Sequence, residues 1–423
     1  MREEKRMNAR ERRLATWRNQ FPTLESLENR ARRRIPYFTF DYLEGGTGNE
    51  MSRHRNYAAL RAVEIVPRYC TDISSIDLST ELFGRRYAAP LVIAPVGMDG
   101  GIWPGATRHL ARTAQELGLA HIMSTMAAAP IEEVARQAPD AFWFQLYSAP
   151  ADDHRVTFDL MRRADAAGAR VLAVTLDIPL PARRVRDMRN GAAVPFRITP
   201  KVLLGMLMRP RWLAALAREG VPRYANLAAY CREGATRREI EGFLRNCRAG
   251  SGITWDLIAR IRDRWPRAMV LKGILHPADA EKARSLGLDG VIISNHGGRQ
   301  FDPSPATIDL VPAIRAAVGR DMTVLMDSGI MSGTDILKTL AVGADAVLAG
   351  RGFMLGLAAL GPDGPRHVAT ALMDELRIAL GQTGARTIAG AASLAVRHRG
   401  CWKPEDFRAP AQAGSAVAMQ PSL

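Results

Sequence analysis

Cysteine is scarce in this sequence, and its positions do not suit metal binding. The chain of 423 residues contains four cysteines, Cys70, Cys231, Cys247 and Cys401, and none has the spacing of a metal-ligand motif. Structural zinc sites and disulfide-rich secreted domains both need grouped cysteines. The sequence therefore predicts no bound metal and a reducing compartment, the cytoplasm.

Long apolar runs are also missing. No segment approaches the ~20 consecutive apolar residues that a membrane-spanning helix needs. The first residues are charged and lack the apolar stretch of a signal peptide, so none is predicted. No Gly-x-Gly-x-x-Gly motif follows the first predicted strand, at residues 91–95, which argues against NAD as a cofactor.

Acidic residues are outnumbered by basic ones. The chain has 58 Lys and Arg residues against 43 Asp and Glu residues, a net charge of +15. Much of the excess lies in residues 2–34. Because runs of charge are usually solvated helix faces, we expect a basic helical extension over residues 1–34 and no nucleic-acid binding. The alternative is a basic scaffold or nucleic-acid binder, which predicts salt-sensitive binding and no turnover.

From residue 89 onward, short apolar strands alternate with helices. Strands are predicted at residues 91–95, 120–124, 142–147, 171–177, 269–274, 291–293, 323–329 and 346–350. Helices are predicted at residues 106–117, 131–137, 153–167, 255–264, 277–286, 305–318, 333–342 and 363–380. Eight strand-helix units predict an α/β fold, a closed (β/α)8 TIM barrel, over residues 35–400. A long insertion at residues 179–254 follows the fourth strand, and residues 401–423, rich in Ala, Pro, Gly and Ser, predict a flexible tail.

One motif at a strand end combines a base with an anion-binding group. Residues 294–300 read Ser-Asn-His-Gly-Gly-Arg-Gln and follow the apolar run at 291–293. His296 can accept a proton and Arg299 can bind a carboxylate, which suits an acid substrate whose neighbouring carbon loses a proton or hydride. The alternative for this motif alone is a glycine-rich turn with a satisfied histidine.

The barrel prediction brings other polar residues to the same place, because the C-terminal ends of all the strands meet on one face. The residues expected around a single pocket are Ser124, Gln145, Tyr147, Thr175, Asp177, Lys272, Ser294, His296 and Asp327. Guanidinium groups for a carboxylate or phosphate are supplied by Arg184, Arg299 and Arg351. Gly329, Gly333 and Gly350 would leave backbone amides open, and a helix N-terminus at 332–335 would add its dipole. Such a ring suits a flat cofactor with a phosphate.

Over about residues 27–383, the sequence resembles a known family, the FMN-dependent L-2-hydroxy acid dehydrogenases and oxidases. The resemblance is carried by the 294–300 motif, with support from Asp41-Tyr42, Phe144-Gln-Leu-Tyr147, Thr175-Leu-Asp177, Leu271-Lys-Gly273 and Asp327-Ser-Gly329. It implies FMN as cofactor and oxidation of an L-2-hydroxy acid, similar to lactate or mandelate, to the 2-oxo acid. The membrane-associated dehydrogenases of the family look most similar, because Trp103-Pro104 and Trp143 accompany these motifs.

The resemblance also implies roles for the cofactor-binding residues. Backbone at Pro95, Val96 and Gly97 would lie against flavin N5. Ser124, Gln145 and Thr175 would hydrogen-bond the isoalloxazine ring, and Lys272 would sit near its N1–C2 edge. The ribityl phosphate arm would be held by Ser294, Asp327, Gly329, Gly350 and Arg351.

For the substrate, the resemblance implies a clamp on the carboxylate by Arg184 and Arg299, with a hydroxyl from Tyr42. His296 would take the proton, and Asp177 would orient the imidazole. Tyr147 would polarise the substrate oxygen. The proton would come from the hydroxyl in a hydride mechanism or from the alpha carbon in a carbanion mechanism, and the sequence leaves both open.

The acceptor and the substrate are less narrowly implied. In the family that this sequence resembles, oxidases commonly have alanine where this chain has Gly97, and glycolate-oxidising members have a bulky aromatic where it has Met126. Both residues favour a dehydrogenase for a larger acid such as mandelate, with a quinone or similar acceptor. The alternatives are an oxidase using oxygen, or packing changes with no bearing on specificity. A homo-oligomer is expected. An alternative of another class is a barrel lyase or isomerase in which Lys272 forms an imine.

Two features depart from the family or leave alternatives open. Met331 stands where relatives have a phosphate-binding arginine, so a cation is missing and FMN is expected to be held more weakly. Within the insertion, residues 201–218 combine apolar residues with arginines around Trp212. This stretch predicts a segment that lies on the inner face of the cytoplasmic membrane, or else a lid over the active site.

Overall fold

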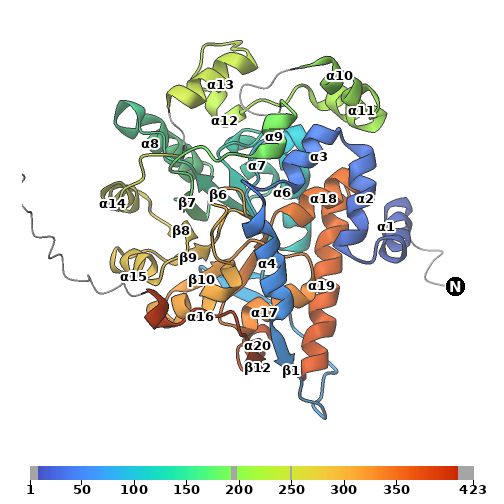
Figure 1. The fold of residues 1–423 in the computed structure, drawn as a ribbon, viewed down its shortest axis with the longest axis vertical. Coiled ribbons are helices and arrows are strands. Elements are labelled where there is room, and N and C mark those ends of the chain that lie inside the picture. The colour runs from blue at the N-terminus through green and yellow to red at the C-terminus, as the bar shows by residue number, and fades with distance from the viewer. Residues whose placement is uncertain (1–7, 192–197, 248–249, 408–423) are drawn as a thin grey trace, which may run out of the picture.

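The computed structural model describes residues 8–191, 198–247 and 250–407. Its centre is a closed barrel of eight parallel strands, in the order β10-β11-β4-β5-β6-β7-β8-β9, which confirms the predicted fold class (Figure 1). The strands are β4 (Leu91–Ile93), β5 (Ala120–Ser124), β6 (Phe142–Leu146), β7 (Val171–Thr175), β8 (Ala268–Ile274), β9 (Gly290–Ile293), β10 (Thr323–Met326) and β11 (Ala346–Ala349). Most of the strand residues are buried, because helices cover the outside while side chains fill the inside.

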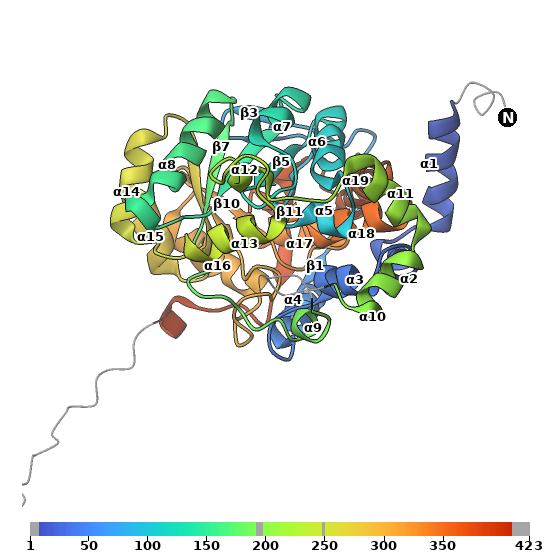
Figure 2. The same cartoon turned by 90° about the horizontal axis from the view of Figure 1, so that it is seen from above.

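Helices form the outer layer around the barrel (Figure 2). They are α6 (Ala106–Leu117), α7 (Ile131–Gln137), α8 (Ala151–Ala166), α14 (Trp255–Arg264), α15 (Pro277–Ser285), α16 (Thr307–Val318), α17 (Gly333–Ala341), α18 (Arg351–Leu360) and α19 (Gly364–Thr383). The sequence prediction missed α18, placing only one helix after the last strand. Every residue of α18 after Arg351 is buried, so the helix has no polar face and no amphipathic period to reveal it.

A small hairpin closes the N-terminal end of the barrel. It consists of β2 (Thr80–Leu82) and β3 (Arg85–Tyr87), and Leu82 and Tyr87 pack among the inward-facing strand residues. The indole Nε1 of Trp143 on β6 donates to the Tyr87 hydroxyl at 3.0 Å, which satisfies a buried polar pair. With this end plugged, a ligand site is left to the C-terminal end.

Helices precede the barrel, as predicted. They are α1 (Ala9–Gln20), α2 (Leu24–Arg34), α3 (Tyr37–Glu44) and α4 (Met51–Ala62). The basic segment is therefore divided, with the break at Phe21 and Pro22. Leu24, Leu27 and Ala31 bury α2 against α18, whereas α1 has no buried residue. β1 (Glu64–Val66) then pairs antiparallel with β12 (Ala395–Arg397) near the other end of the chain.

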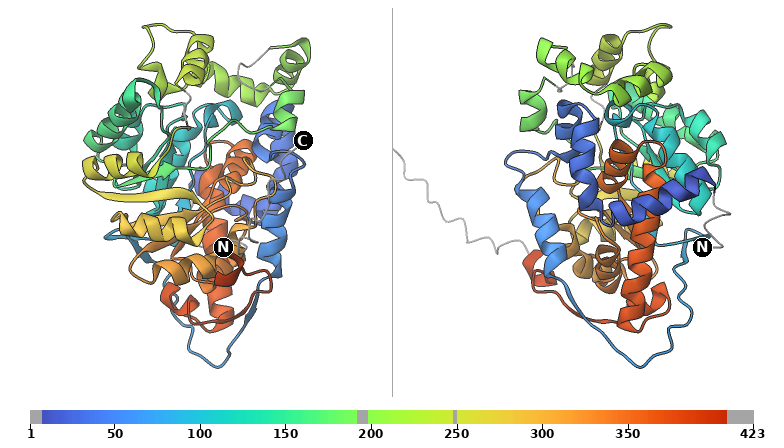
Figure 3. Two further views of the ribbon diagram at one scale, coloured as in Figure 1. Left: turned by 60° about the vertical axis from the view of Figure 1, so that its left-hand side comes forward. Right: turned by 90° about the vertical axis from the view of Figure 1, so that its right-hand side faces the viewer.

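The insertion after the fourth barrel strand lies above the C-terminal end of the barrel (Figure 3). It contains α9 (Val185–Arg189), α10 (Pro200–Leu207), α11 (Pro210–Glu219), α12 (Ala225–Ala228) and α13 (Arg237–Asn246). In the described parts of the chain, no helix is long and apolar enough to span a membrane. The remaining short elements are α5 (Asp99–Ile102), α20 (Ile388–Ala391) and a 3-10 helix (Pro404–Phe407). Most of the predicted C-terminal tail, residues 408–423, lies outside the described residues.

Candidate active site

A cavity of about 810 Å³ lies at the C-terminal ends of the strands, below the insertion. Most of the predicted site residues line it: Tyr42, Pro95, Val96, Gly97, Gln145, Tyr147, Thr175, Arg184, Lys272, His296, Arg299, Asp327, Gly329, Gly350 and Arg351. Ser124, Asp177 and Ser294 do not line the cavity, but each hydrogen-bonds a residue that does. The structure therefore brings the predicted residues together around one space.

His296 is held by a carboxylate and by an unusual backbone conformation. Its Nδ1 lies 3.0 Å from Oδ1 of Asp177, and its φ is +58°, in the left-handed region that a residue with a Cβ rarely adopts. Gly298 follows with φ +76°, and a Cβ there would lie 2.5 Å from the backbone nitrogen of Arg53. The motif needs its glycines because the loop packs directly on α4. This geometry aims the imidazole into the cavity.

The charges around this pair favour a neutral histidine beside an ionised aspartate. Burial lowers the pKa of His296 below its usual range, and Asp177 opposes this only in part. Burial would raise the pKa of Asp177, but His296 and Lys272 outweigh it, so that pKa is lowered. A neutral imidazole next to a fixed negative charge can accept a proton and stabilise the imidazolium that results.

Lys272 is a buried ammonium with two partners. Its Nζ donates to the Ser294 hydroxyl at 2.7 Å and lies 2.9 Å from Oδ2 of Asp327. Burial lowers the pKa of Lys272, but Asp327 and Asp177 outweigh it, so the pKa is raised. An imine-forming lysine needs the opposite shift, which argues against the lyase alternative. A fixed buried cation instead stabilises negative charge on a ligand.

A chain of hydrogen bonds joins the ends of three neighbouring strands. The Ser124 hydroxyl donates to Oε1 of Gln145, and Nε2 of Gln145 donates to the Thr175 hydroxyl, both at 2.9 Å. This fixes the orientation of the Gln145 amide and leaves the hydroxyl hydrogen of Thr175 to point elsewhere. Because Gln145 and Thr175 both line the cavity, the chain presents a polar edge to a ligand.

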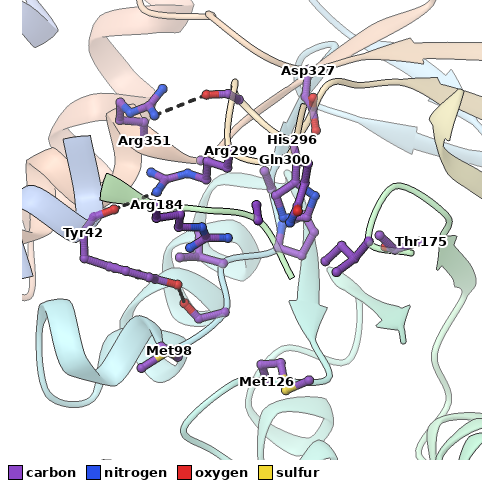
Figure 4. Close-up of a pocket in the computed structure, with 18 of the residues that line it drawn as sticks. Tyr42, Met98, Met126, Thr175, Arg184, His296, Arg299, Gln300, Asp327 and Arg351 are labelled. Atoms are coloured by element: carbon purple, nitrogen blue, oxygen red, sulfur yellow. Dashed lines mark hydrogen bonds between the residues drawn. The ribbon is translucent and has the colours of Figure 1, made fainter. Parts of the chain in front are cut away.

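Three guanidinium groups converge on the cavity (Figure 4). Nη1 of Arg299 donates to the Tyr42 carbonyl at 2.6 Å, and Nε of Arg351 donates to the Leu43 carbonyl at 3.1 Å. Neither Arg184 nor Arg299 forms an ion pair with a carboxylate of the described residues. Burial, Arg351 and Arg184 lower the pKa of Arg299 to about 9. Since a guanidinium stays protonated, this crowding of positive charge creates a place for an anion.

Tyr42 does not point its hydroxyl at an open anion site in this structure. The hydroxyl donates to the Gly97 carbonyl at 2.9 Å, and the ring lies beside the guanidinium of Arg184, 5.6 Å from its centroid. Tyr147 is buried in the same wall, and burial and Asp177 raise its pKa, so it remains a neutral donor.

One wall of the cavity is apolar and comes partly from the insertion. It contains Met98, Met126 and Ile178 from the barrel face, and Tyr224 and Leu244 from the insertion. In Figure 4 the two methionines lie away from Arg351 and Asp327. The sequence prediction named Met126 but missed the other four. No motif marks them as cavity residues. Leu244, for example, lies on the amphipathic helix α13, but the pattern of that helix does not reveal what its apolar face packs against.

The end of the cavity where the sequence predicts the FMN phosphate differs from the prediction in its backbone amides. The N-terminal amides of α17 are already used: Met331 N and Ser332 N donate to Oδ2 of Asp335, and Gly333 N donates to Oε2 of Glu375 at 2.6 Å. The expectation that the Gly333 amide is open to a ligand is therefore wrong, whereas the expectations for the Gly329 and Gly350 amides stay predictions. Met331 lines the cavity without a charge, and Nη1 of Arg351 lies 3.3 Å from the hydroxyl of Tyr57, a residue that the prediction missed.

This chain is similar to known proteins in both sequence and structure. A family model described as FMN-dependent dehydrogenase matches residues 31–398. The L-lactate dehydrogenase of Yersinia pestis is 37% identical over 373 residues, which covers 88% of this chain and 97% of that protein. The crystal structure of a monotopic membrane protein, (S)-mandelate dehydrogenase, has a TM-score of 0.82 at 33% identity and covers 89% of this chain and 99% of its own. A mandelate oxidase structure with (S)-4-hydroxymandelic acid gives 0.77 at 34%, with coverage of 89% and 99%.

Proposed function

Because this chain belongs to the FMN-dependent dehydrogenase family, we propose that it oxidises an L-2-hydroxy acid with a bulky apolar side chain and passes the electrons to a quinone at a membrane. As a member of this family, the chain is an FMN-dependent oxidoreductase acting on the CH–OH group of a 2-hydroxy acid. The substrate, the acceptor and the residue roles are the proposal.

The polar side chains that line the cavity suit the groups of FMN. Gln145 and Thr175 offer a polar edge for the ring system, and the buried Lys272 ammonium suits a position beside its N1–C2 edge. Gly97 and Gly350 line the cavity without a side chain, which lets a flat ligand approach the backbone there. Arg351 and the backbone at Gly329 would hold the phosphate. When bound, FMN accepts the two electrons that leave the substrate.

The arrangement of His296 between Asp177 and the guanidinium groups carries the proposed function. A carboxylate held by Arg184 and Arg299 would place the carbinol carbon of a 2-hydroxy acid within reach of the imidazole. Neutral His296 would take the proton, and Asp177 would stabilise the imidazolium. Tyr42 would have to release Gly97 to reach the carboxylate, while Tyr147 would donate to the substrate oxygen.

The choice of a larger acid depends on the apolar wall. Met98, Met126, Ile178, Tyr224 and Leu244 together give a surface that a methyl group alone would leave largely unfilled. Burying a phenyl-sized group there would gain transfer free energy that lactate lacks. Relatives named for lactate and for mandelate both resemble this chain, so the wall is the feature that favours a mandelate-like substrate.

Membrane association is supported by the exposed face of α10. Leu204 and Leu207 are 58% and 60% exposed, and Leu203 and Met208 extend the same apolar surface. An amphipathic helix of this kind can lie in the headgroup layer. Trp212 is not part of this surface: it is buried and its Nε1 donates to the Ile102 carbonyl at 3.0 Å. Because Tyr224 and Leu244 also line the cavity, we propose that the insertion covers the active site as well as contacting the membrane.

A spectrum tests the proposal directly. The purified protein should show the absorption of oxidised FMN, and (S)-mandelate should bleach it without oxygen faster than L-lactate does. The D enantiomers serve as controls. Addition of a quinone should restore the oxidised spectrum faster than oxygen does. Bleaching by L-lactate alone would contradict the substrate, and faster recovery with oxygen would make the protein an oxidase.

A further inference from the structure

We propose that Arg30, Arg34 and Arg211 form a binding site for the phosphate of an anionic phospholipid headgroup, where α2 meets α11. The inference rests on the proposed membrane contact of α10 and adds the class of lipid that the protein selects. The site is separate from the active-site cavity, whose lining includes none of these arginines.

The three guanidinium groups lie together without acidic partners. The Arg34 guanidinium lies over the ring of Trp103, and Nε1 of Trp212, the residue after Arg211, donates to the carbonyl of Ile102, so the start of α11 lies beside Arg34. In agreement with this, burial, Arg211 and Arg30 lower the pKa of Arg34 to about 10. Within the described residues, no carboxylate forms an ion pair with any of the three. Other arginines of the same N-terminal region are paired: Arg10 with Asp363 at 2.7 Å, and Arg32 with Glu28 at 3.2 Å. Arg12, Arg18 and Arg33 also form no ion pair within the described residues, so the cluster is distinguished by its fixed position between α2 and α11 and not by the lack of partners alone.

Contacts through Nε fix Arg30 and Arg34 in place and leave the terminal nitrogens of their guanidinium groups open. Nε of Arg30 donates to the Ala359 carbonyl at 3.0 Å, and Nε of Arg34 donates to the Ala358 carbonyl at 3.2 Å, both at the C-terminal end of α18. The two guanidiniums also lie against aromatic rings, Arg30 on Phe21 and Arg34 on Trp103. Their terminal nitrogens form no hydrogen bond with the described residues. Guanidinium forks held in this way can bind phosphate oxygens without first losing much side-chain freedom.

The position of the cluster favours a lipid over other phosphates. α2, α10 and α11 lie at the same side of the molecule (Figure 2). Nε of Arg209 donates to the Ile35 carbonyl at 3.1 Å, which ties the α10–α11 junction to the end of α2. A Cβ on Gly205 of α10 would lie 2.9 Å from the ring of Tyr37 on α3, so α10 packs closely beside this junction. An apolar helix face can enter the acyl region of an anionic membrane, and unpaired cations at the same edge of the protein can bind its headgroup phosphates.

Vesicle binding by the full-length, FMN-loaded protein tests the site. The wild type should bind vesicles of phosphatidylcholine mixed with phosphatidylglycerol more tightly than vesicles of phosphatidylcholine alone, and added salt should weaken the difference. Arg211→Gln is the main variant, because the Arg211 side chain makes no hydrogen bond to the described residues and its loss should not affect folding. We expect a loss of about fivefold in binding to the anionic vesicles, the value of one cation near such a surface. Arg211→Lys should recover most of it.

Arg320→Gln is the matched control. Arg320 is exposed between α16 and β10, and its substitution removes the same charge without touching the cluster. It should bind both kinds of vesicle as the wild type does. An equal loss in Arg320→Gln would mean that only net charge matters, which would overturn the site.

Two further outcomes separate the site from the membrane proposal. If the wild type binds both vesicle types equally, the headgroup site is wrong while the apolar contact stands, and Leu204→Gln should then abolish binding. If the wild type binds neither, the membrane contact fails and the site fails with it. If inorganic phosphate at low concentration stabilises the protein against heating and Arg211→Gln removes that effect without altering vesicle binding, the ligand is a soluble phosphate and the lipid assignment is wrong.

Discussion

The imidazole of His296 directs one nitrogen at Asp177 and the other away from it. Nδ1 lies 3.0 Å from Oδ1 of the aspartate, while Oδ2 of the aspartate has no hydrogen-bond partner among the described residues. Among the described residues, the Asp177 carboxylate therefore forms its side-chain hydrogen bond with His296 alone. This fixes the tautomer in which Nε2 carries the lone pair, which is the form a base in the cavity needs.

Asp177→Asn should show how much the orientation and tautomer of the His296 imidazole contribute to activity. The amide can present its NH₂ group to Nδ1 and so favour the wrong tautomer, and we expect kcat/KM to fall by about 10³ to 10⁴. Asp263→Asn, at an exposed position, is the control for loss of a carboxylate. A variant with nearly full activity would show that Asp177 does not orient the base.

The pH profile gives a second measurement on the same pair. The pKa of His296 is lowered, so the neutral base is present above that pKa and is lost as pH falls through it. In the wild type, the acidic limb of kcat/KM should therefore lie below the usual histidine value of about 6.5. Asp177 raises the pKa of His296, so Asp177→Asn should move the limb to still lower pH. A limb that moves upward would contradict this assignment.

His296→Gln should keep FMN and lose most turnover. The imidazole makes the proton transfer but is not needed to hold the ring system or the phosphate, so the yellow colour should remain while kcat falls by about 10² to 10⁴. Because φ at this position is +58°, His296→Asn is a useful second variant, since asparagine tolerates this conformation better. Loss of colour in both variants would mean that His296 supports the cofactor site. Full activity in either would refute its role as base.

The strand order and the location of the site could be predicted because both follow from local patterns. Short apolar runs ending in polar residues mark barrel strands, and the fold then places every strand end on one face. His296, Lys272 and Asp177 meet in the structure for that reason, although they are far apart in the sequence.

Features that depend on long-range packing could not be predicted in this way. The helix α18 is buried on all sides, so it lacks the pattern that reveals a surface helix. Tyr224 and Leu244 reach the cavity from the insertion, and the helical pattern of residues 237–246 does not show which part of the barrel they face. The amides before α17 look available in the sequence, but Glu375, from α19, occupies the Gly333 amide. Each case requires knowledge of a partner far along the chain.

Lys272→Met should damage both the fold and the cofactor. Nζ of Lys272 lies 2.9 Å from the buried carboxylate of Asp327, and removal of one partner leaves the other charge uncompensated, at a cost of about 3–5 kcal/mol in unfolding free energy. The potential of bound FMN should also fall, because a cation that stabilises the reduced ring is lost. Denaturant unfolding and the flavin potential measure the two effects. Lys272→Arg keeps the charge and should lose much less of each; an unchanged potential in Lys272→Met would place the ammonium away from the ring.

Met331→Arg should tighten FMN binding. Met331 lines the cavity without a charge, and the nearby amides at the start of α17 are occupied, which leaves Arg351 as the cation we assign to the phosphate. A new guanidinium there could add a charge-assisted hydrogen bond of about 1.5–3 kcal/mol. The dissociation constant of FMN should then fall by about 10 to 100-fold, which a fluorescence titration of the FMN-free protein can measure. Met331→Leu, which changes shape but not charge, should bind FMN as the wild type does. If Met331→Arg binds no more tightly than these two, another group, such as the Tyr57 hydroxyl beside Arg351, already compensates for the missing cation.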